Sequence, residues 1–391
     1  MISASFGACA TGMPRAVRQQ HAAPAISALQ AGRFEDARAA AEKVLAQQPR
    51  AVEAHLVLAI ARYRETMHGF VVAMFGATSM FMGNRGYGTV LRNAIKTTES
   101  DLAVVEQHLS KAVVDDVSLD LCLACWEYDW NHSGEVDDND RHLMEVEMGA
   151  DGEPYPDGDP RRRPTFHFDV GDVHWARAMI SFQRAVFDFV LAFRFEDALA
   201  QALQNDDKFR IPLDSKERIT AMRTRLLEGF GHSDASRLAI VAEADDDREW
   251  VPNPGQKNHP LPLPVDQKLF DTWATIVDDL RKLVKGQESI DVAQAAQAGD
   301  HQWKNPPQGF INIGTLFEHP NDIVVTKAEA ESVEDQERKA VEKFLSTMFG
   351  AAYVPSAKAS GLITHLRRMR DEVEGGQESI ERKLRYLLWL N

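Results

Sequence analysis

Hydrophobic positions recur at helical spacing along most of the chain. In residues 22–63, alanine and leucine side chains fall three or four positions apart, first before Gly32 and again before Pro49. Glycine favours the end of one helix and proline stops the next, so this segment predicts a helical hairpin. Residues 51–82 and 87–114 continue the spacing and predict further helices.

The rest of the chain repeats this spacing in longer and shorter stretches. Residues 166–204 predict one long helix, with Asp172 near its start and an apolar face made of Trp175, Met179, Phe182, Val186, Phe189 and Phe193. Further helices are expected at 215–228, 236–242, 269–283, 327–349, 360–374 and 378–390. Residues 309–317 alternate and predict the chain's one short strand. The pattern therefore indicates a mainly α-helical protein with little or no β-structure.

Residues 22–63 also resemble one tetratricopeptide repeat, with Gly32, Phe34, Ala37 and Pro49 at its key positions. A single repeat cannot bury both of its faces, so the resemblance implies that other helices stack on it. It also implies that residues 21–114 dock a protein partner. A plain helical hairpin of other ancestry is the alternative interpretation.

The predicted elements divide the chain into a flexible N-terminus (1–20), a tetratricopeptide-like helical region (21–114), a larger helical domain (115–320) and C-terminal helices (321–391). The tetratricopeptide-like region is expected to pack on the larger domain. Three segments of that domain, at 166–175, 245–254 and 273–286, are similar to a group of uncharacterised bacterial proteins. The similarity implies that 115–320 is one domain, and it brings no activity with it.

Composition narrows the classes of partner. The chain has 391 residues, of which 44% are hydrophobic, and a net charge of −15. This acidity disfavours nucleic acids and anionic membranes as main partners. No run of about eighteen apolar residues occurs, so no membrane span is expected. A cytoplasmic location is expected, with export or a lipoprotein anchor left open because a mis-assigned start codon would hide a signal. The oligomeric state is not predicted.

The chain's three cysteines are too few for a disulfide framework. Cys122 and Cys125 form a CxxC sequence, which in a thioredoxin-like site opens a helix after a strand. Here the pair is expected inside a helix, with Cys125 at an apolar position. Core packing is therefore favoured over a redox role.

The segment that carries the clearest chemistry is the loop 129–140. Its oxygen-bearing residues fall at positions 1, 3, 5, 9 and 12 of a twelve-residue stretch, with a glycine at position 6. This spacing lets one short loop surround a hard cation with oxygen ligands, most simply Ca²⁺, with Mg²⁺ also possible. The candidate ligands are Asp129, Asn131, Ser133, Glu135 through its backbone carbonyl, Asp137 and Asp140.

Residues 119–148 around this loop resemble an EF-hand. Leu121, Cys125 and Tyr128 share one face of an expected entering helix, and an exiting helix is expected to include Val146. Asp140 stands where the EF-hand pattern has glutamate, so the resemblance implies weaker Ca²⁺ binding or tolerance of Mg²⁺. An acidic, solvated turn without a bound cation is the alternative.

A second candidate is the cluster of His167, Asp169, Asp172 and His174, which is spaced closely enough for Zn²⁺ or Fe²⁺. It would support a metal-dependent hydrolase, although helix capping and hydrogen bonding are the simpler interpretation. The sequence contains no established catalytic motif, so a non-enzymatic role is favoured. The expected function is a Ca²⁺-binding helical scaffold or adaptor for a protein partner. A metal-independent structural subunit is the remaining alternative.

Overall fold

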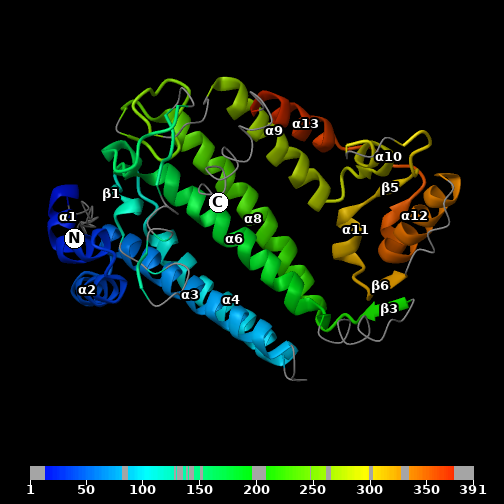
Figure 1. The fold of residues 1–391 in the computed structure, drawn as a ribbon, viewed down its shortest axis with the longest axis horizontal. Helices are drawn as coiled ribbons and strands as arrows, with labels where there is room; N and C mark the ends of the chain where they lie inside the picture. The colour runs from blue at the N-terminus through cyan, green and yellow to red at the C-terminus, as the bar shows by residue number, and fades with distance from the viewer. Residues whose placement is uncertain are drawn as a thin grey trace, which may run out of the picture.

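The computed structural model shows a mainly α-helical protein, with long helices in its body and short strands that join distant segments (Figure 1). It describes residues 14–81, 87–126, 129, 135–137, 140, 145–149, 153–195, 208–246, 248–260, 266–298, 303–326 and 334–373. The predicted fold class is thus confirmed as mainly helical. The tetratricopeptide-like character of the first helices stays a prediction.

Four helices form the N-terminal part: α1 (Arg15–Gln30), α2 (Phe34–Gln47), α3 (Val52–Phe81) and α4 (Tyr87–Lys111). Between α1 and α2, Gly32 has a φ of 70°, a left-handed conformation that glycine adopts without the steric clash of a Cβ. Pro49 follows the end of α2 and prevents the helix from continuing. The predicted hairpin and the two helices after it are therefore confirmed.

Two long helices, α6 (Val170–Ala192) and α8 (Lys216–Ala242), lie side by side across the middle of the molecule (Figure 1). Helix α4 packs on α6, and α9 (Gln267–Val284) packs on α8. The pair therefore joins the N-terminal helices to the C-terminal part. Helix α9 also confirms the helix predicted at 269–283.

The predictions for these two helices need correction. Residues 166–168 form a strand, so the long helix predicted over 166–204 begins only at Val170. It was also predicted too long, because α6 ends at Ala192 and Phe193 is extended; residues 196–204 lie outside the described residues. Helix α8 is continuous, where two separate helices were predicted. Helix α6 packs closely on α8 at Gly229, where a Cβ would come 2.4 Å from Phe182 Cε1 of α6. This close contact explains why a glycine stands within the helix. Val186, predicted on the apolar face of α6, is 58% exposed.

The segment between α4 and α6 contains a short antiparallel pair, β1 (Leu119–Leu121) and β2 (Phe166–Phe168), with Leu121 opposite Phe166. One 3-10 turn, η1 (Leu123–Cys125), follows β1, and another, η2 (Pro160–Arg162), precedes β2. The entering helix predicted before the acidic loop was therefore wrong. Leu119 and Leu121 are buried while Asp120 is exposed, which is the two-residue alternation of a strand.

Short strands organise the C-terminal part. Strand β3 (Lys208–Ile211) pairs with β6 (Ile323–Thr326), and a second sheet has the order β4 (Ile290–Asp291), β5 (Phe310–Ile311), β7 (Tyr353–Val354). The helical elements here are α10 (Val292–Ala296), α11 (Ile313–Glu318), α12 (Glu334–Phe349), η3 (Gly350–Ala352) and α13 (Leu362–Val373). The expectation of one strand at 309–317 was wrong, because this stretch holds only β5 before α11 begins. Both sheets cross the predicted domain boundary at 320.

The largest hydrophobic core lies where the N-terminal helices meet the β1–β2 pair and the first half of α6. It includes side chains as distant in sequence as Ala25 and Trp250, and smaller clusters lie around Ile219 and Phe230. Among the described helices, none is long and apolar enough to cross a membrane.

Candidate functional site

A largely apolar cavity of about 220 Å³ adjoins the largest core. Its walls come from α3, α4, β1, η1, β2 and α6, and Trp126 and Trp250 add their rings to the lining. Aliphatic side chains such as Leu56, Val105 and Ile180 form much of the surface. Because protein interiors are otherwise closely packed, a cavity of this size is a candidate binding site.

Strands β1 and β2 provide a part of the cavity wall that the helices do not. Leu121 and Phe168 line the cavity from the two strands. Phe166 and Phe168 both pack against Trp250, with ring centroids 4.6 and 5.5 Å apart respectively. Trp250 thus holds a segment that follows α8 against the strand pair and closes one side of the cavity.

The lining holds two buried indole N–H groups. Trp126 is 3% exposed, and its Nε1 has no partner among the described residues; the same holds for the buried Nε1 of Trp175. The Trp126 ring packs edge-on against Phe34 and lies 4.9 Å from the Arg64 guanidinium carbon. A buried donor without an acceptor is energetically unfavourable, so both indoles favour an acceptor brought from outside.

A carboxyl group is a further polar feature of the cavity, whose lining also includes Tyr63 and Arg64. Asp172 lines it and is 8% exposed. Burial, reinforced by the nearby charge of Asp169, raises the pKa of Asp172 well above its usual value and favours the neutral carboxyl. A neutral carboxyl can donate a hydrogen bond, as the two indoles can, so the cavity combines apolar walls with donors.

Asp172 belongs to a group of acids at the start of α6. The Asp169 side chain accepts from the backbone N–H groups of Gly171 and Asp172, and Asp172 Oδ2 accepts from Asp169 N–H at 3.1 Å. Burial and the Asp169 carboxylate raise the pKa of Glu243, which hydrogen-bonds Asp169. This reciprocal capping arrangement fixes Asp172 at the cavity wall.

The predicted hydrolase cluster is occupied by such local interactions. His167 Nδ1 lies 2.7 Å from Asp120 Oδ1 on the neighbouring strand, and His174 stacks on His232. Asp169 and Asp172 form the helix cap, as the simpler interpretation expected. Within the part of the chain that the structure describes, no group of three or more His, Cys, Asp or Glu is arranged to hold a metal ion.

The predicted cation loop is described only in part. Asn131 and Ser133 lie outside the described residues, whereas Asp129, Glu135, Asp137 and Asp140 lie within them. Asp137 Oδ1 accepts from Asp140 N–H at 3.1 Å, and Asp140 Oδ2 accepts from Asp137 N–H at 3.0 Å. Asp140 is 2% exposed, so this bond pair includes a buried carboxylate.

The region after the loop also differs from the EF-hand expectation. Val146 was placed on an exiting helix, but residues 145–147 have no regular secondary structure. Val146 is fully buried, and its N–H donates to the carbonyl of Arg162 at 2.9 Å. This long-range bond replaces the helical one, so the exiting helix does not reach Val146.

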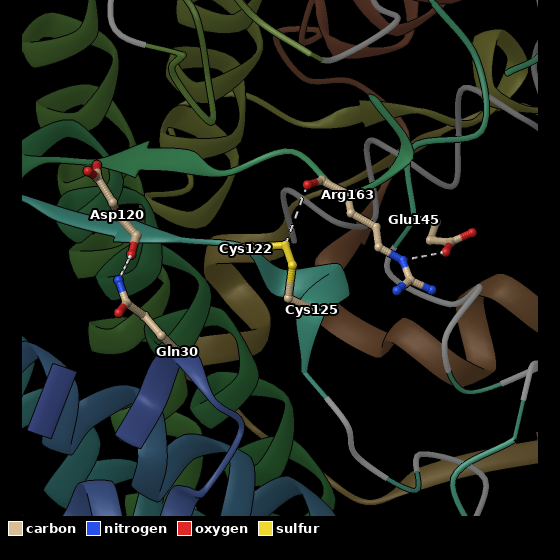
Figure 2. Close-up of a disulfide and its surroundings, with 6 residues drawn as sticks. All are labelled: Gln30, Asp120, Cys122, Cys125, Glu145 and Arg163. Atoms are coloured by element: carbon tan, nitrogen blue, oxygen red, sulfur yellow. Dashed lines mark hydrogen bonds and ion pairs between the residues drawn. A yellow bond between two sulfur atoms is a disulfide. The ribbon is translucent and has the colours of Figure 1, made fainter. Parts of the chain in front are cut away.

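The cysteine prediction was wrong. Cys125 is exposed, and it forms a disulfide with Cys122 at the turn that follows β1 (Figure 2). The Gln30 side chain at the end of α1 donates to the carbonyl of Asp120, so the end of α1 lies beside strand β1, which precedes this turn. The helical spacing of Leu121 and Cys125 misled the prediction because the segment is not helical.

No family model, curated protein or solved structure matches this chain. The fold and the cavity define a mainly α-helical protein with an apolar cavity between α3, α4, α6 and the β1–β2 pair. The sequence pattern did not indicate Trp126 or Trp250 as cavity residues. It placed Trp175 on an apolar helix face and did not indicate a hydrogen-bond donor there. The nearest signal was the alternation of apolar residues before Trp126. Such alternation indicates a half-buried strand and does not by itself indicate a binding site.

Proposed function

We propose that this protein binds a small, mainly apolar molecule that carries a hydrogen-bond acceptor, in the cavity between α3, α4 and α6. The observation that carries the proposal is the pair of buried indole donors, Trp126 and Trp175, without partners among the described residues and in one apolar lining. A ligand acceptor between or beside them would satisfy donors that the fold leaves unsatisfied.

The cavity's volume limits the ligand's size. An engineered protein cavity of about 150 Å³ takes up benzene, so a cavity of about 220 Å³ suits one ring or a short branched chain with a few further atoms. Its polar groups limit the chemistry. Indole N–H groups and a neutral Asp172 carboxyl donate hydrogen bonds, so the preferred polar atom is a carbonyl or ether oxygen.

The test compares two probes of similar shape, acetophenone with a carbonyl and ethylbenzene without one, by ligand-observed NMR titration. Wild-type protein should bind both, and acetophenone more tightly. Trp126→Phe and Trp175→Phe should each weaken acetophenone binding about five-fold, since each removes one hydrogen bond, and leave ethylbenzene binding nearly unchanged. Trp303→Phe, which lies outside the cavity lining, is the matched control.

A variant in which a larger side chain fills part of the cavity provides a second test. Ala176 lines the cavity from α6, and Ala176→Leu should occupy part of the space and reduce the binding of both probes. Saturable binding that Ala176→Leu leaves intact would place the probes elsewhere and overturn the proposal. So would the absence of binding by either probe to folded wild-type protein.

The second candidate function is the cation-binding helical scaffold. We propose that the loop 129–140 binds Ca²⁺, with Mg²⁺ as a competitor, and that the helices of region 21–114 dock a protein partner. The oxygen-ligand spacing of the loop supports it, and the reciprocal bonds between Asp137 and Asp140 are compatible with a compact turn. The test is Tb³⁺ luminescence with Ca²⁺ as competitor.

Asp129→Ala should abolish a saturable Tb³⁺ signal, while Asp101→Asn, an exposed acid on α4, should preserve it. A signal that both variants keep would reflect general surface acidity and would contradict the cation proposal. This experiment is independent of the cavity, so each candidate can fail alone.

A further inference from the structure

The disulfide between Cys122 and Cys125 spans only three positions in the sequence. A disulfide stabilises a fold chiefly by closing a loop of the unfolded chain, and the effect grows with the number of residues enclosed. A disulfide that closes so short a loop therefore contributes little to the stability of the folded protein. Its position within one turn indicates a role other than joining distant segments.

The two sulfur atoms differ in their surroundings. Cys125 is exposed at the end of η1, whereas Cys122 is partly buried at its start. Cys122 Sγ lies 3.5 Å from the carbonyl oxygen of Arg163. A dashed line marks this contact in Figure 2. An external thiolate can therefore reach Cys125 more easily than Cys122, and access decides which sulfur is attacked.

The same carbonyl favours the reduced state of Cys122. A disulfide sulfur carries no proton to donate, but a Cys122 thiol could donate its S–H to the Arg163 carbonyl. Arg163 is held in place by its guanidinium, which donates to Glu145 at 2.9 Å. Reduction therefore adds a hydrogen bond to an acceptor that is already positioned (Figure 2).

We propose that Cys122–Cys125 is a thiol–disulfide exchange site that a dithiol partner reduces through attack on Cys125. The partner's thiolate forms a new S–S bond with Cys125 Sγ, the protein disulfide breaks, and its electron pair leaves on Cys122 as a thiolate. Cys122 takes a proton from water and is then able to donate to Arg163. The partner's second thiolate attacks the partner's own sulfur in the mixed disulfide and releases Cys125 as a thiolate, which takes the second proton from water.

The exchange balances in atoms and electrons. The protein disulfide gains two electrons and two protons and becomes two thiols, and the dithiol loses them and becomes a disulfide. Neither cysteine belongs to the paired residues of β1 and β2, so we expect the strand pair to persist when the turn is not crosslinked. A dithiol is thus the chemical class of co-reactant required.

The experiment uses the full chain with Cys9→Ser, so that only the pair contributes thiols. The folded protein is equilibrated with graded mixtures of reduced and oxidised dithiothreitol, quenched in acid and labelled with a maleimide of known mass. Two thiols should appear together without denaturant, and should disappear again as the oxidised form is increased. A disulfide that resists reduction until the protein unfolds would overturn the proposal.

The site of attack is tested with single-cysteine variants in the same background. Glutathione disulfide should modify the protein that retains Cys125 about ten-fold faster than the one that retains Cys122, since access controls the rate. Circular dichroism establishes that both variants are folded. If either variant is unfolded, the thiol count on the Cys9→Ser protein still decides the proposal. Faster modification at Cys122 would overturn the assigned direction.

Discussion

Glu243 at the end of α8 hydrogen-bonds Asp169 at the start of α6, which ties the two central helices together at one end. Burial and the charges of Asp169 and Glu249 raise the pKa of Glu243 far above its usual value of 4.5. The folded protein therefore keeps a proton that the unfolded chain releases.

Stability should consequently fall as the pH rises. The contribution of this proton is complete below the usual pKa of glutamate and is lost as the pH climbs toward the raised value, and Asp172 acts in the same direction. The melting temperature should decrease between about pH 5 and about pH 9. Glu243→Gln, which keeps a donor, should flatten this decline, whereas Glu35→Gln on the exposed surface of α2 should not.

The buried ion-pair network between α4, α6 and α8 gives a second prediction. Asp188 is fully buried, and its carboxylate accepts from Arg218 at 2.6 Å and from Arg225 at 2.5 Å. Asp188→Ala leaves two guanidinium groups without this carboxylate and should lower the free energy of unfolding by about 3 kcal/mol in urea denaturation. Asp234→Ala, which breaks the partly exposed pair with Arg281, should cost about 1 kcal/mol or less. An equal loss of unfolding free energy in the two variants would contradict the expectation that the buried ion pair contributes more than the partly exposed one.

The contact between α6 and α8 gives a third prediction. A methyl group at Gly229 would come 2.4 Å from Phe182 Cε1, and that ring packs on Phe230. Gly229→Ala should therefore destabilise the protein by about 1–3 kcal/mol through overpacking. Gly231→Ala is the matched control, because nothing lies within 4 Å of its added Cβ. That variant should gain up to about 1 kcal/mol from the higher helix propensity of alanine, measured by thermal melting.

The indole donors give a fourth prediction, made without ligand. Trp273 Nε1 donates to Ser233 Oγ at 2.9 Å, whereas Trp126 Nε1 has no partner among the described residues. Trp273→Phe removes a hydrogen bond and leaves Ser233 without this donor, at a cost of about 1 kcal/mol or more. Trp126→Phe removes an unfavourable donor, so its melting temperature should be affected less. A larger loss for Trp126→Phe would mean that its N–H has an acceptor in the folded protein.

The helices could be predicted because their signals are local. Gly32, Pro49 and the spacing of apolar residues between them determine where α1 and α2 end. The strand β1 was missed because its partner, β2, lies far along the chain, and Leu121 with Cys125 fits a helical spacing by coincidence. One helix was predicted to end at 228, directly before Gly229, yet the place of Gly229 within α8 depends on Phe182 of another helix.

The cavity could not be predicted for the same reason. Its lining extends from Leu56 to Trp250 and exists only after several elements have packed together. The acidic loop was visible because its residues are consecutive, but spacing alone does not determine the fold around it. Cys125 shows the limit of a residue-type argument, since cysteine is commonly buried and this one is exposed.

The extent of the largest core has a consequence for biosynthesis. Its first members belong to α1, and it is completed by Val173, Ile180 and Trp250. Helices α1 to α4 therefore leave the ribosome before the side chains that cover their apolar faces have been translated. Part of these apolar faces stays uncovered while residues 112–250, more than a third of the chain, are synthesised, which makes the interval a natural point for chaperone binding or aggregation.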